Sequence, residues 1–123
     1  MSTVKTAIDK ARSEAQALEK KIEANTAKRH AELRVEVENT ATDAKRLATS
    51  IKTLADGQRA DAKQHLRDAA ARLEEAATHA KSVAGASEAQ LRATNHAMFD
   101  RAQLALQNIS HAIALTRSAT SKN

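Results

Sequence analysis

The chain has 123 residues, with no cysteine, no proline, two glycines and one aromatic residue, and its formal net charge is +5 at pH 7. The length suits a single domain, and the lack of cysteine excludes a disulfide framework or a thiolate metal site. Alanine is the commonest residue, and it is the best helix former. Because turns draw on proline and glycine, we predict an all-α fold.

The two glycines are the strongest helix-ending signals, and they divide the chain into three predicted helices. Gly57 follows the first helix and Gly85 the second, as a C-terminal stop does. Ser87 is predicted to cap the third helix, with Gln90 completing a capping box three residues later. We therefore expect one domain (1–123), a coiled-coil-like bundle of three long antiparallel amphipathic helices joined by short connections. The predicted helices span about 3–55, 58–84 and 87–119, and residues 118–123 form a polar tail.

Apolar residues recur at alternating steps of three and four, the spacing of a heptad seam. The first predicted helix has two such runs: Val4, Ile8, Ala11, Ala15, Leu18 and Ile22, then Leu33, Val37, Thr40, Ala44, Leu47, Ile51 and Leu54. The second has Ala62, Leu66, Ala69, Leu73, Ala76, Ala80 and Val83, flanked by Ala70, Ala77 and Ala84. The step of eight residues from Leu54 to Ala62 breaks the phase, which agrees with a turn at Gly57.

The eleven-residue step from Ile22 to Leu33 is a stutter in the heptad pattern. It is lined by Asn25, Thr26, Arg29 and His30, which either fix register or partner or form the solvated middle of a protruding helix. With no glycine or proline there, we predict a continuous first helix about 75–80 Å long, twice what its neighbour covers. Its first half must project, bend back as a fourth helix, or pair with another molecule. We favour pairing in an antiparallel homodimer.

The third predicted helix has no charged residue from Ala102 to Thr116, a stretch too short and too polar to span a bilayer. Its large apolar residues lie on more than one face, so the helix expects more than one neighbour. It is either the most buried helix of an oligomer or a segment that meets a partner. These residues are Leu104, Leu106, Ile109, Ile113 and Leu115.

We predict no catalytic residue, no metal site and no cofactor. No two histidines have the i, i+4 spacing with which one helix holds a metal, although histidines of different helices could converge. The chain has no glycine-rich phosphate loop and no nucleophile elbow. We therefore expect a protein that is not an enzyme. The histidines are His30, His65, His79, His96 and His111.

The leading hypothesis is a scaffold or adaptor that acts by coiled-coil association, with itself as a homodimer or higher oligomer, or with another helical protein. Because the chain starts without an apolar leader, we expect it in the bacterial cytoplasm. The predicted partner-binding residues are Val4, Ile8, Leu18, Ile22, Asn25, Arg29, His30, Leu104, Leu106, Ile109 and Ile113.

Two alternatives are less favoured. The composition is similar in general style to granule-coating phasins and apolipoprotein-like helices, which implies a coat on lipid or granule surfaces, but the seams are thin for that role. A basic stripe beside the first seam could instead track nucleic-acid phosphates or an anionic membrane surface, without aromatic residues on which bases stack. The stripe consists of Lys10, Lys21, Lys28 and Arg46.

Overall fold

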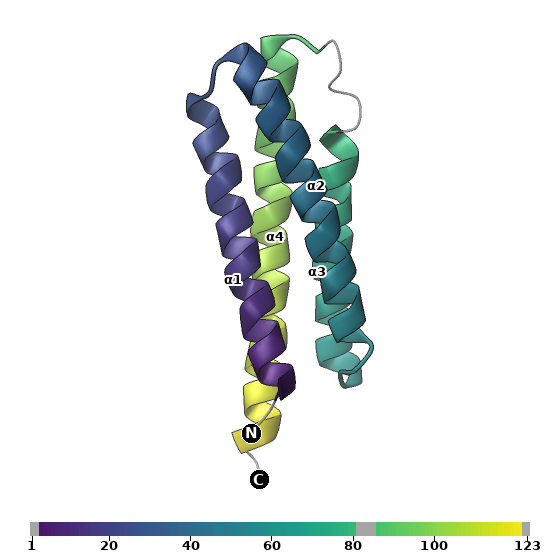
Figure 1. Cartoon of the computed structure of the whole chain (residues 1–123). Coiled ribbons are helices and arrows are strands. Elements are labelled where there is room, and N and C mark those ends of the chain that lie inside the picture. The colour runs from purple at the N-terminus through teal and green to yellow at the C-terminus, as the bar shows by residue number, and fades with distance from the viewer. Residues whose placement is uncertain (1–2, 81–85, 122–123) are drawn as a thin grey trace.

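The computed structural model describes residues 3–80 and 86–121, with side chains placed at 7–80 and 86–115. The described chain is helical throughout apart from its turns. It comprises α1 (Thr3–Ala24), the single 3-10 turn η1 (Asn25–Ala27), α2 (His30–Ala55), α3 (Ala60–His79) and α4 (Glu88–Ser121). Successive long helices run in opposite directions, so the start of α1, the α2–α3 turn and the end of α4 lie at one end of a narrow bundle (Figure 1).

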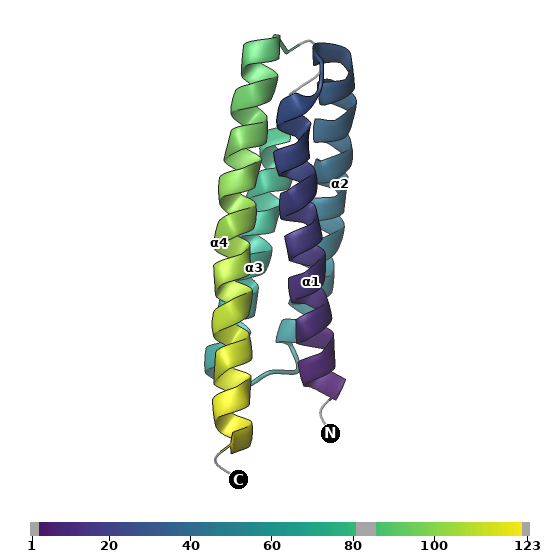
Figure 2. The same ribbon diagram turned by 90° about the vertical axis from the view of Figure 1, so that its left-hand side faces the viewer.

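The four long helices surround one core. α1 packs against α2 and α4, α3 packs against the same two helices, and α2 and α4 also touch across the bundle. Figure 2 shows α1 and α4 side by side, with α2 and α3 behind them. The interface between α3 and α4 is the most extensive, and that between α1 and α2 is the least extensive of the four neighbouring pairs.

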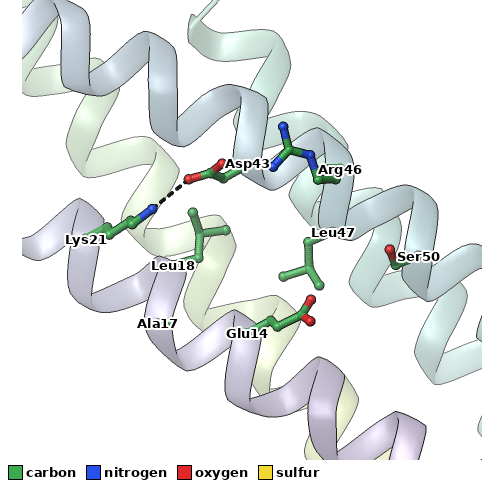
Figure 3. Close-up of a pocket in the computed structure, with 8 residues that line it drawn as sticks. All are labelled: Glu14, Ala17, Leu18, Lys21, Asp43, Arg46, Leu47 and Ser50. Atoms are coloured by element: carbon green, nitrogen blue, oxygen red, sulfur yellow. Dashed lines mark hydrogen bonds and ion pairs between the residues drawn. The ribbon is translucent and has the colours of Figure 1, made fainter.

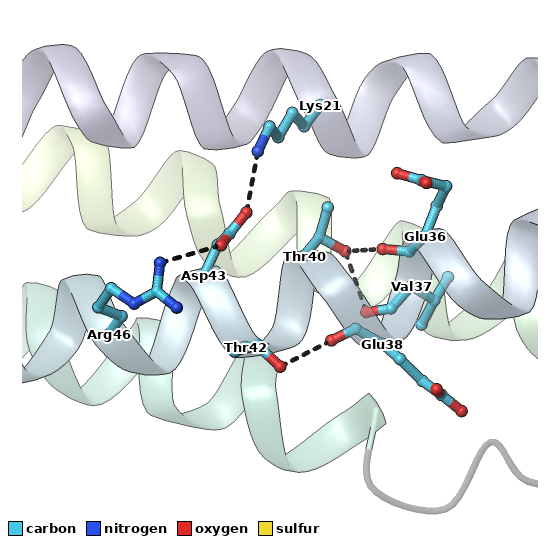
Figure 4. Close-up of polar contacts among 8 residues, drawn as sticks. All are labelled: Lys21, Glu36, Val37, Glu38, Thr40, Thr42, Asp43 and Arg46. Atoms are coloured by element: carbon cyan, nitrogen blue, oxygen red, sulfur yellow. Dashed lines mark hydrogen bonds and ion pairs between the residues drawn. The ribbon is translucent and has the colours of Figure 1, made fainter.

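The heptad seams predicted for 3–55 and 58–84 form the α1, α2 and α3 sides of this core, which confirms the reading of the apolar spacing there. The α4 side, which includes Leu91 and Met98, was not predicted as a seam. Ala70 and Ala77 are buried beside the α3 seam as expected. Thr40 is buried in the α2 seam, where its hydroxyl donates to the carbonyls of Glu36 and Val37 at 2.9 and 3.0 Å (Figure 4). More than half of the buried apolar residues in the described chain are alanines. The side chains of Val4, Val83 and Ala84 lie outside the described residues.

The prediction of one continuous helix over 3–55 is wrong, and the described residues form four long helices instead of three. After η1 the backbone is extended at Lys28 (ψ 150°) and Arg29 (ψ 164°), and the chain reverses there. The first half of the predicted helix bends back as a fourth helix, the alternative that the sequence reading did not favour. Its apolar seam is therefore covered within the chain, and the excess length that suggested pairing does not exist.

The helix ends agree with the sequence in part. The capping box of α4 is confirmed: Gln90 N donates to Ser87 Oγ at 3.2 Å, and Ser87 N donates to Gln90 Oε1 at 2.8 Å. Gly57 does not act as a left-handed stop, and an added Cβ would meet only the Leu54 carbonyl oxygen, at 3.8 Å. The predicted stop at Gly85 lies outside the described residues, and the predicted polar tail continues α4 as far as Ser121.

Candidate functional site

Two buried asparagines join the end of α1 to α4. Asn25 Nδ2 donates to Asn95 Oδ1 at 3.1 Å, and Asn95 Nδ2 donates to the carbonyl of Ile22 at 2.9 Å. The two residues are only 2% and 3% exposed. A buried amide without a partner costs about 1–3 kcal/mol. The asparagine pair therefore specifies the level at which α1 and α4 meet.

Arg92 of α4 binds the backbone of the α1–α2 turn. Its Nη1 donates to the carbonyl of Thr26 at 2.9 Å and its Nη2 to the carbonyl of Lys28 at 3.1 Å. The end of a helix leaves its last carbonyls without partners, and a cation there is favoured by the helix dipole. Arg92 supplies both the donors and the charge. We call Asn25, Arg92 and Asn95 together the latch.

Local contacts complete the turn. The Thr26 hydroxyl donates to the carbonyl of Glu23 at 2.8 Å, and Lys28 N donates to the carbonyl of Asn25 at 3.0 Å. His30 Nε2 lies 3.2 Å from the carbonyl of Ala86, which precedes α4. The reversal thus occurs without glycine or proline, because the start of α4 satisfies the carbonyls that the end of α1 exposes.

An open groove of about 340 Å³ lies between α1 and α2 (Figure 3). Leu18 of α1 and Leu47 of α2 both extend into the space between the two helices. Lys21 Nζ bridges the groove to Asp43 Oδ2 at 3.0 Å, and Arg46 Nη1 lies 3.8 Å from Asp43 Oδ1 (Figure 4). The bridging side chains are 63% and 32% exposed, and such ion pairs contribute about 0–1 kcal/mol. The polar link between α1 and α2 is therefore weak.

The structure places most of the predicted partner-binding residues inside the bundle. Ile8, Leu18, Ile22, Asn25, Ile109 and Ile113 are buried. Leu104 and Leu106 are half-buried, and Leu106 packs against the core. Arg29 and His30 are exposed, while Val4, as stated above, has no described side chain.

Sequence reasoning missed Arg92 and Asn95, the two α4 members of the latch. A signal for Asn95 was present, because it occupies a seam position between Leu91 and Met98 in α4. A polar residue in a seam often fixes register, and Asn25, in η1 directly after the α1 seam, is its polar counterpart. Arg92 lies beside the seam and gives no such signal.

Two of the four residues of the predicted basic stripe lie beside an acid. Lys21 and Arg46 both lie beside Asp43. Lys10 is exposed and Lys28 is half-buried. The Asp43 carboxylate reduces the positive potential that would attract a phosphate.

Histidines of different helices do converge in one place. His65 of α3 and His111 of α4 have ring centroids 5.3 Å apart in an edge-on arrangement. Within the described residues, no group of three or more His, Cys, Asp or Glu side chains is arranged to hold a metal ion. None of the helices that the structure describes combines the length and the hydrophobicity of a membrane span.

Comparisons with protein-family models, with curated proteins and with solved structures find no match. Function has therefore to be inferred from the geometry of the bundle. Two features stand out in that geometry: the latch, which holds α1 at one end, and the groove, where α1 meets α2 loosely.

Proposed function

We propose that the chain is a non-enzymatic helical scaffold that acts by coiled-coil association, and that α1 is the helix through which it associates. The observation that supports this proposal is the weak packing of α1 against α2. Its interface with α2 is the least extensive between neighbouring helices, is opened by the groove and is bridged by an exposed ion pair. A helix held in this way can be exchanged for another helix of the same pattern.

The opposite helix, α3, shows the contrast. Glu74 of α3 binds Lys52 of α2 at 2.6 Å, and Glu75 of α3 binds Arg101 of α4 at 2.8 Å. Its interfaces with both neighbours are also the two most extensive in the bundle. The α2–α3–α4 unit therefore forms a platform on which α1 docks through its seam of Ile8, Leu18 and Ile22.

Sedimentation of the pure protein from micromolar to millimolar concentration tests the proposal. We expect a concentration-dependent increase in mass with no loss of helix signal, because each α1 seam that leaves its own bundle is satisfied in another. A well-folded monomer over the whole range would contradict the proposal. Circular dichroism on the same samples provides the control for folding.

A coat on lipid or apolar granule surfaces is a second candidate. The thin seams make it the weaker of the two, and the small apolar burial within the closed bundle is the observation that favours it. Since more than half of the buried apolar residues in the described part of the chain are alanines, the closed bundle gains little apolar burial per helix, and an apolar surface can compete for the same seams. Flotation with lipid vesicles separates the two functions. A coat floats with the vesicles in proportion to lipid, whereas a scaffold that associates only with helices stays in the dense fraction.

A further inference from the structure

We infer that residues 25–29 form a hinge, and that a second copy of this chain takes up α1 when the hinge straightens. Two copies then exchange their α1 helices reciprocally, each docking on the α2–α3–α4 platform of the other. This inference rests on the proposed function and names its partner and its moving part. Three observations carry it.

The first observation is that few residues need to move. Ala24 has helical backbone angles (φ −62°, ψ −26°), and residues 25–27 already form a 3-10 turn. Lys28 and Arg29 are extended, and both residue types are good helix formers. Rotation of these two residues, with relaxation of the 3-10 turn, joins α1 and α2 into one helix over 3–55. Such a short hinge between two packed elements is typical of helix exchange between copies.

The second observation is that the seams stay in phase across this hinge. At about 100° per residue, the eleven-residue step from Ile22 to Leu33 rotates the seam by only about 20°. The eight-residue step from Leu54 to Ala62, across the α2–α3 turn, rotates it by about 80°. Straightening the α1–α2 turn therefore gives one helix with a single continuous apolar face. Straightening the α2–α3 turn would give a helix whose apolar face is interrupted.

The third observation is that the bend depends on α4. The carbonyls of Thr26 and Lys28 are bound by Arg92, and the carbonyl of Ile22 by Asn95. In a continuous helix those carbonyls are bound by the helix itself. The latch therefore sets the balance between the closed monomer and the exchanged dimer. In that dimer the two straight helices run antiparallel, because α1 is antiparallel to the α2 on which it docks.

Cross-linking tests the exchange, since the chain has no native cysteine. Lys21 of α1 and Asp43 of α2 touch within one chain when the bundle is closed, and they touch between chains after exchange. A Lys21→Cys chain is mixed with an Asp43→Cys chain, and a short bismaleimide is added. We expect a covalent heterodimer that accumulates with time and protein concentration. A mixture of Lys21→Cys with Lys45→Cys, an exposed α2 position outside the groove, controls for random collision.

The latch variant sharpens the test. Adding Arg92→Ala to both chains removes two charged hydrogen bonds that exist only in the closed monomer. We therefore expect the association constant for dimerisation to rise about tenfold or more. Arg67→Ala is the matched control, because Arg67 lies 3.7 Å from Asp56 at the other turn; we expect it to leave the constant unchanged. Should Arg92→Ala fail to fold, Thr26→Ala, an exposed substitution that favours helix at the hinge, is expected to shift the equilibrium in the same direction.

The outcomes separate the hinge from the proposed function. If dimers form but the heterodimer cross-link does not, the copies associate through another surface. That result would contradict the hinge and would still agree with the proposed scaffold function. Folded latch variants that remain monomeric also overturn the hinge. If the unmodified chain is monomeric at every concentration as well, the proposed function fails with it.

Discussion

Asn25 and Asn95 lie 70 positions apart in the chain and share a buried hydrogen bond of 3.1 Å. Asn25 lies in η1, directly after the α1 seam, and Asn95 lies in the α4 seam, and the buried residues next to each of them are apolar. Shifting α1 along α4 by one heptad would leave both amides facing methyl groups. The pair therefore fixes the register of the two helices, and with it the point at which the chain can reverse.

Asn95→Ala is expected to lower the free energy of unfolding by about 2 kcal/mol, because it leaves the Asn25 amide and the Ile22 carbonyl buried without this partner. Urea unfolding followed by circular dichroism measures the change. Asn39→Ala, at an exposed position of α2, is the control and should change stability by less than about 0.5 kcal/mol. Equal stability of the two variants would show that the latch does not hold α1.

Ser87→Ala removes the capping box at the start of α4. We expect the free energy of unfolding to fall by about 1 kcal/mol, since the backbone N–H of Gln90 loses its hydroxyl acceptor. Thermal and urea unfolding both report this loss. Ser110→Ala, on the exposed surface of the same helix, should be neutral or slightly stabilising. A loss confined to Ser110→Ala would contradict the cap.

Arg59→Ser is expected to stabilise the bundle. Arg59 is the N-cap of α3 with extended backbone angles (φ −68°, ψ 159°), and its side chain makes no capping hydrogen bond. Serine at this position can accept from the first free amides of α3, which typically adds about 1 kcal/mol, and the change removes a cation from the positive end of the helix dipole. The midpoint of urea unfolding should rise, with an unchanged slope. A lower midpoint would show that Arg59 has another role.

Gly57→Ala is expected to raise the free energy of unfolding by about 0.4–1 kcal/mol. Gly57 is exposed and its φ is not left-handed, so alanine fits and restricts the unfolded chain. Differential scanning calorimetry should show a higher melting temperature. A lower one would mean that the turn does require glycine, as the sequence alone had suggested.

The sequence predicted the all-α class and most core residues of α1, α2 and α3, because heptad spacing in an amphipathic helix is a local property. In α4 it named Ile109 and Ile113 but not Leu91, Met98 or the buried alanines. It also predicted the Ser87–Gln90 cap, another local pattern. It did not predict the chain reversal at Lys28, because the side chain that donates hydrogen bonds to the carbonyls of this turn, Arg92, belongs to α4. The eleven-residue step was a break in the heptad pattern like the eight-residue step at Gly57, but it kept the seam in phase and had no glycine to mark a turn.

The candidate site was predictable only in part for the same reason. Asn25 and His30 were singled out as polar residues in the stutter, and the structure shows them contacting Asn95 and the Ala86 carbonyl. The sequence could not show which groups they would contact, since another molecule and another part of the same chain can both supply hydrogen-bond acceptors. Whether Arg29 has a partner-binding role stays a prediction.

The position of Arg92 and Asn95 late in the sequence has a consequence for synthesis. A ribosome makes α1 and α2 well before it makes the two residues that hold them bent. Until then no side chain of α4 holds the bend, and we expect the segment 3–55 to sample the straight form of the inferred exchange. We expect some chains made by neighbouring ribosomes on one message to be released as dimers that have exchanged their α1 helices. Differently tagged copies should then be recovered together more often after co-expression than after mixing of the purified proteins.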